Sequence, residues 1–261
     1  YTTYEWSADE AVNSGEWSEN GQKASWNLYS ATNAAGWWDA CYNYIGHCHM
    51  FLNLLKESNP TGATEEDKKR WKAEAEFLKA YYHFRLLEMY GPIPIVDDRM
   101  PQSTLPEDFP GRSHFDYVID YIVNQKLNEE TINALPDVGK ADDWGRATKS
   151  AALALRGRAL LYAASPLWNG KFPYPDWKNT NYETPGYGYE LVSRQEDRGK
   201  WDRALQANLE ALRVAESTGE RKLVDMDNLP NTMRDVPIPY IAGVDTSTVE
   251  GKEFAKRVLM L

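Results

Sequence analysis

The sequence has few cysteines, no long apolar run and a shortage of positive charge. Its two cysteines, Cys41 and Cys48, would lie about 10 Å apart in one helix at 1.5 Å rise per residue, too far to pair with each other. No apolar run approaches the roughly 20 residues of a membrane-spanning helix. Lys and Arg number 29 against 39 Asp and Glu. The resulting net charge of -10 argues against nucleic acid as a partner, because phosphate binding needs a basic surface.

Motifs with a known catalytic or metal-binding mechanism are also missing. The sequence contains no H-E-x-x-H, no G-x-S-x-G, no phosphate-binding loop and no Cys/His spacing typical of zinc. His47 and His49 would point to different faces of a helix, so they do not predict a shared metal. Asp225-x-Asp227 resembles the start of a calcium loop, but Pro230 stands where that loop needs glycine. We therefore predict no catalytic residue, no metal and no cofactor.

The two ends of the sequence are unusual. It begins Tyr1-Thr2 without an initiator methionine or a signal peptide, and it ends on the apolar residues VLML. We expect a mature or truncated chain. Its 261 residues suffice for the core of one large domain or two small ones.

The stretch 71–96 predicts a long central helix. Thr64 and Asp67 form an N-cap with an acidic first turn, and Gly91-Pro92 ends the helix. Two apolar stripes predict burial between neighbouring helices, with Tyr81, Tyr82 and Phe84 in the core. The stripes consist of Ala73, Phe77, Ala80, Tyr81, Phe84 and Leu87, and of Ala75, Leu78, Tyr82, Leu86 and Met89.

Periodicity predicts four further helices, at 37–55, 113–135, 147–164 and 201–217. The helix at 147–164 is rich in small residues, which permit close helix–helix approach. The helix at 201–217 is amphipathic through Trp201, Ala204, Leu205, Asn208, Leu212 and Ala215.

The same plan occurs twice along the chain. The helices at 71–90 and 147–164 are each followed by an irregular insertion, near 91–112 and 165–199, and then by an amphipathic helix. This arrangement predicts a mainly α fold of tetratricopeptide-like helical pairs with long irregular loop insertions. The aromatic residues of the second insertion argue against disorder.

Aromatic content is high, with 10 Trp and 16 Tyr, and much of it lies in loops. Loop tryptophans either cover helix ends or provide faces on which a sugar ring stacks, and the sequence leaves both open. Planar amides beside them would hydrogen-bond sugar hydroxyls. The predicted ligand-binding residues are Trp168, Trp177, Tyr174, Trp26, Trp37 and Asn169.

Four stretches together resemble the SusD/RagB family, in the right order over roughly residues 26–261. They are AEAEFLKAYY at 73–82 with MYGPIP at 89–94, the pattern Trp38-x-x-x-Tyr42-x-x-Ile45, the block from Arg146-Ala147-Thr148 to ASPLWNG at 164–170, and Trp201-x-x-Ala204. The resemblance implies a SusD-like α-α superhelix over 1–261, the N-terminal helical domain of a protein whose C-terminal half is absent from this sequence.

That resemblance also implies a function. It indicates a non-enzymatic, lipid-anchored protein on the extracellular face of the outer membrane. Such a protein captures oligosaccharide or polysaccharide and delivers it to a SusC-like TonB-dependent transporter. Its lipidated cysteine would lie upstream of Tyr1.

Two alternatives stay open. An intracellular tetratricopeptide scaffold would have a continuous groove with few insertions, which the long aromatic loop argues against. An α-helical glycoside hydrolase would need two carboxylates, such as Asp97 or Asp98 with another, about 5 to 10 Å apart across a cleft.

Overall fold

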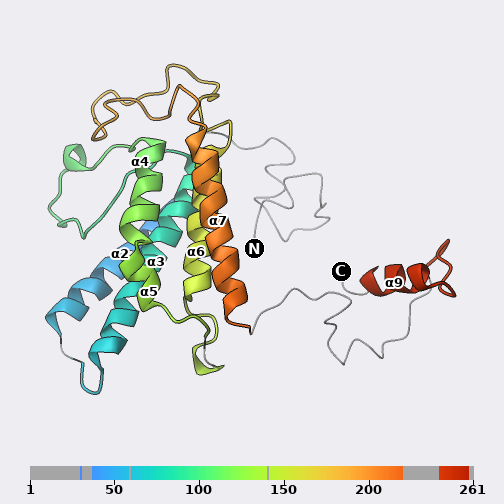
Figure 1. Cartoon of the computed structure of the whole chain (residues 1–261). Helices are drawn as coiled ribbons and strands as arrows, with labels where there is room; N and C mark the ends of the chain where they lie inside the picture. Colours follow the sequence, from blue (N-terminus) through green and yellow to red (C-terminus); the bar gives the residue numbers. More distant parts are fainter. Residues whose placement is uncertain (1–29, 31–36, 59, 140, 220–240, 259–261) are drawn as a thin grey trace. The chain divides into compact units, whose positions relative to one another are not determined.

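A computed structural model describes residues 30, 37–58, 60–139, 141–219 and 241–258 (Figure 1). Trp26 and the Asp225-x-Asp227 segment lie outside these residues. The described part is mainly helical and contains no extended sheet strand, which confirms the predicted class. Contacts divide the chain into two units, Tyr1–Val214 and Ala215–Leu261. None of the helices in the described ranges is long and apolar enough to span a membrane.

The first unit holds most of the helices. They are α2 (Trp37–Glu57), α3 (Glu65–Tyr90), α4 (Phe115–Asp120), the π-helical segment η3 (Tyr121–Lys126), α5 (Glu129–Ala134), α6 (Lys149–Ala164) and α7 (Gly199–Ser217), with short 3-10 turns η2 (Pro106–Asp108) and η4 (Ala141–Asp143). In the second unit, α9 (Val249–Val258) is preceded by Thr248, whose hydroxyl accepts from Gly251 N at 3.0 Å.

Helix α3 begins and ends where the sequence predicts. Thr64 Oγ1 accepts from Asp67 N at 3.1 Å, and Asp67 Oδ2 accepts from Thr64 N at 3.0 Å, which completes a capping box. At the other end Gly91 adopts φ +65° and donates its N–H to the Leu87 carbonyl. Glycine tolerates this positive φ because it has no Cβ.

Some residues of each predicted apolar stripe of α3 are buried and others are exposed. Ala73, Ala75, Ala80, Phe84, Leu86 and Leu87 are buried. The prediction that Tyr81 lies in the core is wrong, because its side chain is 40% exposed and its ring packs edge-on against Tyr82. Leu78 is likewise 38% exposed and lines a surface pocket between α2 and α3. The buried side of α3 instead includes the polar residues Lys79 and His83.

The predicted helix 113–135 is not continuous. Helix α4 runs into η3, where Leu127 N donates to the Ile122 carbonyl in an i→i−5 bond. The chain then leaves the helix at Leu127, and Asn128 caps α5 by accepting from Thr131 N at 2.8 Å. The wide π turn and this new cap break the helix. The predicted apolar positions are nevertheless all buried: Phe115, Val118, Ile119, Ile122, Val123, Leu127, Ile132 and Leu135.

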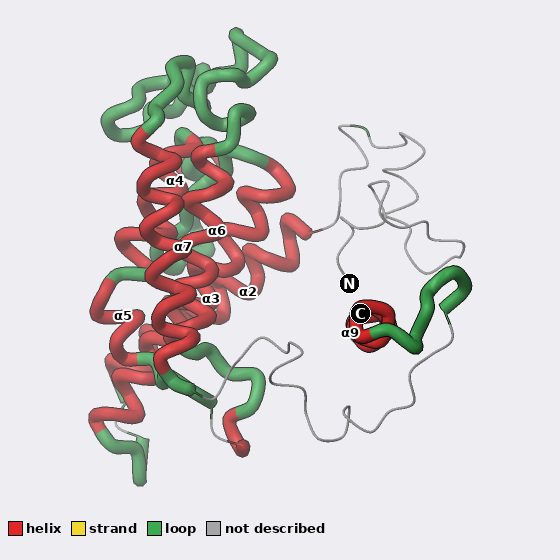
Figure 2. Tube along the Cα trace, turned by 45° about the vertical axis from the view of Figure 1, so that its right-hand side comes forward, coloured by secondary structure: helices red, strands yellow, loops and turns green. Residues whose placement is uncertain are grey.

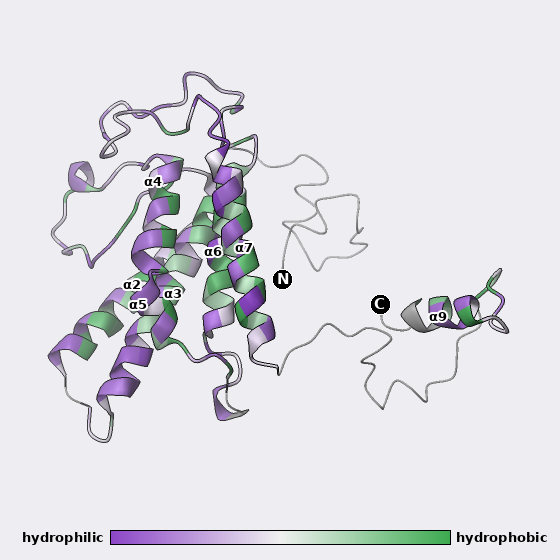
Figure 3. Ribbon diagram, viewed as in Figure 1, coloured by the Kyte–Doolittle hydropathy of each residue, from purple (hydrophilic) through white to green (hydrophobic). Residues whose placement is uncertain are grey.

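Helices α6 and α7 lie side by side in both views (Figures 1 and 2). They approach closely at Gly157, where a Cβ would lie 2.8 Å from Asn208 Oδ1. Asn208 also donates to the Gly157 carbonyl at 3.2 Å, so the small residue has the predicted packing role. On the predicted apolar face of α7, Ala204 is buried, whereas Trp201, Leu205 and Leu212 are about half exposed. Figure 3 shows hydrophobic residues in green along α7 among hydrophilic residues in purple.

Both loop insertions lie at the same end of the first unit (Figure 1). They are joined by hydrogen bonds from Asn179 Nδ2 to the Arg112 carbonyl at 2.7 Å and from His114 N to Thr184 Oγ1 at 2.9 Å. The helical pairs thus carry a single layer of interlocked loops at one end.

Candidate functional site

The aromatic residues of the second loop form a column on the helix ends. The Trp168 ring stacks on Phe115 with centroids 4.2 Å apart, and Phe172 lies between Trp168 and Trp177 at 5.4 and 5.0 Å. Both tryptophans also approach Gly91 so closely that a Cβ there would lie 2.8 Å and 3.4 Å from their rings. Protein atoms therefore contact these rings, and the geometry favours the covering of helix ends over an open sugar platform.

Tyr174 has the most exposed ring of this loop. Its side chain is 68% exposed and meets Phe172 edge-on at 5.8 Å. Arg194 holds the backbone beneath it by donating to the carbonyls of Tyr174 and Pro175 at 3.0 and 2.7 Å. An exposed ring on a fixed backbone is a good stacking surface.

Asn169 and Trp37 have structural partners. Asn169 is buried and closes the base of the loop, because its Oδ1 accepts from Asp197 N at 2.8 Å and its Nδ2 donates to the Asp197 carbonyl at 3.0 Å. Trp37 begins α2, with the Arg85 guanidinium 5.6 Å above its ring. The structure does not bring Trp37 into the column of Trp168 and Trp177.

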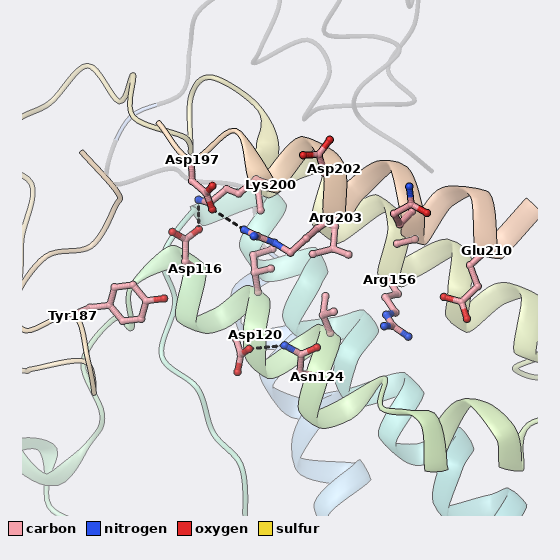
Figure 4. A pocket seen from close by; sticks show the side chains of 16 residues that line it. Asp116, Asp120, Asn124, Arg156, Tyr187, Asp197, Lys200, Asp202, Arg203 and Glu210 are labelled. Atoms are coloured by element: carbon pink, nitrogen blue, oxygen red, sulfur yellow. Dashed lines mark hydrogen bonds and ion pairs between the residues drawn. The ribbon is translucent and has the colours of Figure 1, made fainter. Parts of the chain in front are cut away.

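A groove of about 740 Å³ lies between α4 with η3, α6 and α7, and is named the helical groove here (Figure 4). Its floor is apolar and includes Ile119, Val123, Leu160 and Ala163. Planar polar side chains surround this floor: Asp120, Asn124, Arg156, Asp202, Gln206 and Glu210.

Ion pairs close one end of the helical groove. Lys200 Nζ lies 2.6 Å from Asp116 Oδ1, and Ser193 Oγ donates to the other carboxylate oxygen at 2.5 Å. Arg203 donates to Asp197 at 2.8 Å, a bond that holds the pKa of this carboxyl below its usual value. The Lys200–Asp116 pair fixes the start of α7 against α4.

The rest of the rim has polar atoms that are able to hydrogen-bond a ligand. Asp120 accepts from Asn124 at 2.6 Å, and both side chains are exposed and line the groove. The Nε of Arg156 is buried without a hydrogen-bond partner among the described residues. Figure 4 shows Arg156 and Glu210 toward the end of the groove away from Asp116. A buried donor without a partner is costly unless another group satisfies it.

Tyr187 provides an aromatic ring at the mouth of the helical groove. It stacks on His114 with centroids 4.0 Å apart and planes within 15°, and is 39% exposed. Burial lowers the pKa of His114, whose Nδ1 accepts from Asp116 N at 3.1 Å. A neutral His114 therefore fixes one face of Tyr187.

Asp97 does not resemble a catalytic acid. Burial would raise its pKa, but hydrogen bonds from Lys126 and Tyr121, both 2.8 Å long, outweigh burial and hold the pKa well below its usual value. A general acid of a glycosidase needs a raised pKa. The carboxylate of Asp97 instead balances the buried charges of Lys79 and Lys126.

The helical groove was not predicted from the sequence. A signal was present, because Arg203, Gln206 and Glu210 recur at helical spacing, as do Asp120 and Asn124. The same spacing is typical of a solvent-exposed face, so only the packing of α4, α6 and α7 identifies these residues as the lining of a groove.

Comparison with known proteins gives consistent matches. Residues 2–161 match the family model SusD-like_3, described as starch-binding and associating with the outer membrane. A SusD-like protein of Bacteroides ovatus is 26% identical over 137 residues, which are 52% of this chain and 23% of that protein.

Solved structures extend the match to most of the chain. The structure of BT4246 is 44% identical, with a TM-score of 0.84 over 92% of this chain and 39% of that one. A SusD-like protein from Bacteroides fragilis, 21% identical with a TM-score of 0.55 over 78% of this chain and 31% of that one, supports the fold alone. The chain thus spans well under half the length of each of these relatives.

Proposed function

The chain belongs to the SusD-like family, and from this we propose that it binds oligosaccharide or polysaccharide, with the helical groove as a binding surface. The observation that carries the proposal is the composition of this groove. Planar amide, carboxylate and guanidinium groups surround an apolar floor, with the ring of Tyr187 at the mouth. Such groups hydrogen-bond sugar hydroxyls, while apolar and aromatic surface contacts the C–H face of the sugar.

The charge of the helical groove favours neutral saccharides. Its lining contains five carboxylates, Asp116, Asp120, Asp197, Asp202 and Glu210, against Arg156, Lys200 and Arg203. Because a net negative lining repels anionic groups, acidic sugars bind less well there. A neutral sugar loses little to this field and can accept hydrogen bonds from the exposed amides of Asn124 and Gln206.

The loop aromatics remain part of the proposal. Tyr174 offers a second stacking surface, since its ring is exposed and its backbone is fixed. For Trp168, Trp177, Trp37 and Asn169, the protein contacts argue for structural roles, and contact with a ligand stays a prediction.

We further propose that the protein acts at the outer membrane as a lipid-anchored, extracellular, non-enzymatic component that delivers saccharide to a SusC-like TonB-dependent transporter. The family description supports an association with the outer membrane. The resemblance of the motifs at 73–94 and 146–170 to the SusD/RagB family supports the proposed transport partner, lipid anchor and extracellular face.

The test is a binding panel of neutral oligosaccharides, including maltoheptaose, measured by titration calorimetry with release of reducing sugar assayed in parallel. Binding without release supports the proposal. Release of reducing sugar would support the hydrolase alternative, and a panel without any binding would contradict saccharide recognition by this chain.

A further inference from the structure

A second groove, named the lysine groove here, lies between α2, α3 and the segment that follows α3. Its volume is about 490 Å³, within the size range of small-molecule sites. Six lysines line it, Lys56, Lys68, Lys69, Lys72, Lys79 and Lys126, against four carboxylates, Glu65, Glu76, Asp97 and Asp98. This excess of lysine occurs in a chain whose net charge is -10.

Ion pairs at the base of the lysine groove engage two of its four carboxylates, Asp97 and Glu76. Lys79 and Lys126 are 2% and 8% exposed. Asp97 lies 3.4 Å from Lys79 and 2.8 Å from Lys126, and Glu76 lies 3.3 Å from Lys126. Because both buried lysines pair with carboxylates, the base is a connected network, with the Asp97 side chain 61% exposed at its edge.

The rim carries the excess positive charge. Lys68 pairs with Glu65 at 2.8 Å and Lys72 with Glu130 at 3.0 Å, but these pairs are exposed and such pairs contribute little energy. Lys56 and Lys69 are exposed and have no ion pair within 4 Å among the described residues.

The arrangement on α3 concentrates this charge in one place. Lys68, Lys69 and Lys72 stand at i, i+1 and i+4, on the side of the helix that also presents Lys79 to the groove. Lys56, from the end of α2, lines the same groove from the opposite helix. An anion in the groove would therefore meet ammonium groups from two helices.

We propose that the lysine groove binds the carboxylate or sulfate group of an acidic saccharide. Both groups accept charge-assisted hydrogen bonds from ammonium donors. The inference rests on the proposed function for the class of ligand, but it concerns a different surface. Segment η3 contributes Asn124 to the helical groove and Lys126 to the lysine groove, and the two grooves have opposite excess charge.

The test measures the affinity of the full chain for digalacturonate and for its dimethyl ester, which has the same sugar rings without the negative charges. The affinity for the acid should be at least roughly tenfold higher than for the ester, and added NaCl should weaken the binding of the acid. The double substitution Lys56→Gln with Lys69→Gln should lower affinity for the acid roughly tenfold. The matched control, Lys171→Gln with Lys252→Gln, removes two exposed lysines outside the groove and should leave that affinity unchanged.

Equal affinity for acid and ester would overturn the inference, as would an unchanged affinity after substitution of Lys56 and Lys69 or an equal loss in the control. The outcome is separable from the proposed function. If no neutral saccharide binds but digalacturonate shows this pattern, the assignment of the helical groove fails and that of the lysine groove stands.

Discussion

Replacing Trp168 by alanine separates a residue that covers a helix end from one that binds sugar. The ring stacks on Phe115 at 4.2 Å and on Phe172 at 5.4 Å, and packs against the hydrophobic core. Truncation of a core Trp or Phe costs about 3–5 kcal/mol, and each aromatic pair contributes about 0.5–1.5 kcal/mol beyond its buried area. Because Trp168 is partly buried, we expect a loss of about 3 kcal/mol.

Urea unfolding measures this loss as a fall in the transition midpoint at constant slope. The matched variant Tyr174→Ala removes a ring that is 68% exposed, and should cost less than about 1 kcal/mol. A Trp168→Ala protein that is within about 0.5 kcal/mol of the wild type in stability but no longer binds saccharide would refute the structural role of Trp168.

Two further predictions concern stability. Burial lowers the pKa of His83 to about 4, below its unfolded value of about 6.5. Because the unfolded chain therefore takes up the proton first, the free energy of unfolding is highest above pH 6.5 and falls by about 3 kcal/mol toward pH 4. His83→Gln should reduce the pH dependence of the urea midpoint between pH 7 and 5. A pH dependence equal to that of the wild type would contradict this pKa. Gly91→Ala should cost about 2–4 kcal/mol, from its positive φ and from a Cβ 2.8 Å from Trp168, whereas Gly62→Ala, with positive φ and open space, should cost about 1–2 kcal/mol by the same unfolding assay. Equal losses in the two glycine variants would show that the contact with Trp168 is unimportant.

The ends of α3 could be predicted because local chemistry sets them. The side chains of Thr64 and Asp67 each accept a hydrogen bond from the other residue's backbone N–H, and Gly91 supplies the positive φ that ends the helix. By contrast, the apolar spacing from Ile122 to Leu127 remains compatible with a continuous α-helix. The π turn and the cap at Asn128 depend on how that segment packs.

The candidate site was only partly predictable because its contacts join distant segments. The sequence identified the aromatic loop, but the stacking of Trp168 on Phe115 links residues 53 positions apart. Likewise, Asn124, Arg156 and Gln206 come from three separate helical segments. Asn124 and Gln206 lie on polar faces that would look the same in solvent. Packing alone turns these faces into a groove.

The most direct test of saccharide recognition in the helical groove is the affinity of the best-bound neutral oligosaccharide for the double variant Asn124→Ala with Gln206→Ala. Both residues line the groove and are exposed. Since each lost hydrogen bond costs about 0.5–1.5 kcal/mol, affinity should fall about tenfold, while the control Gln125→Ala, next to the groove but not lining it, should bind like the wild type. An unchanged affinity in the double variant, or an equal loss in the control, would contradict the assignment.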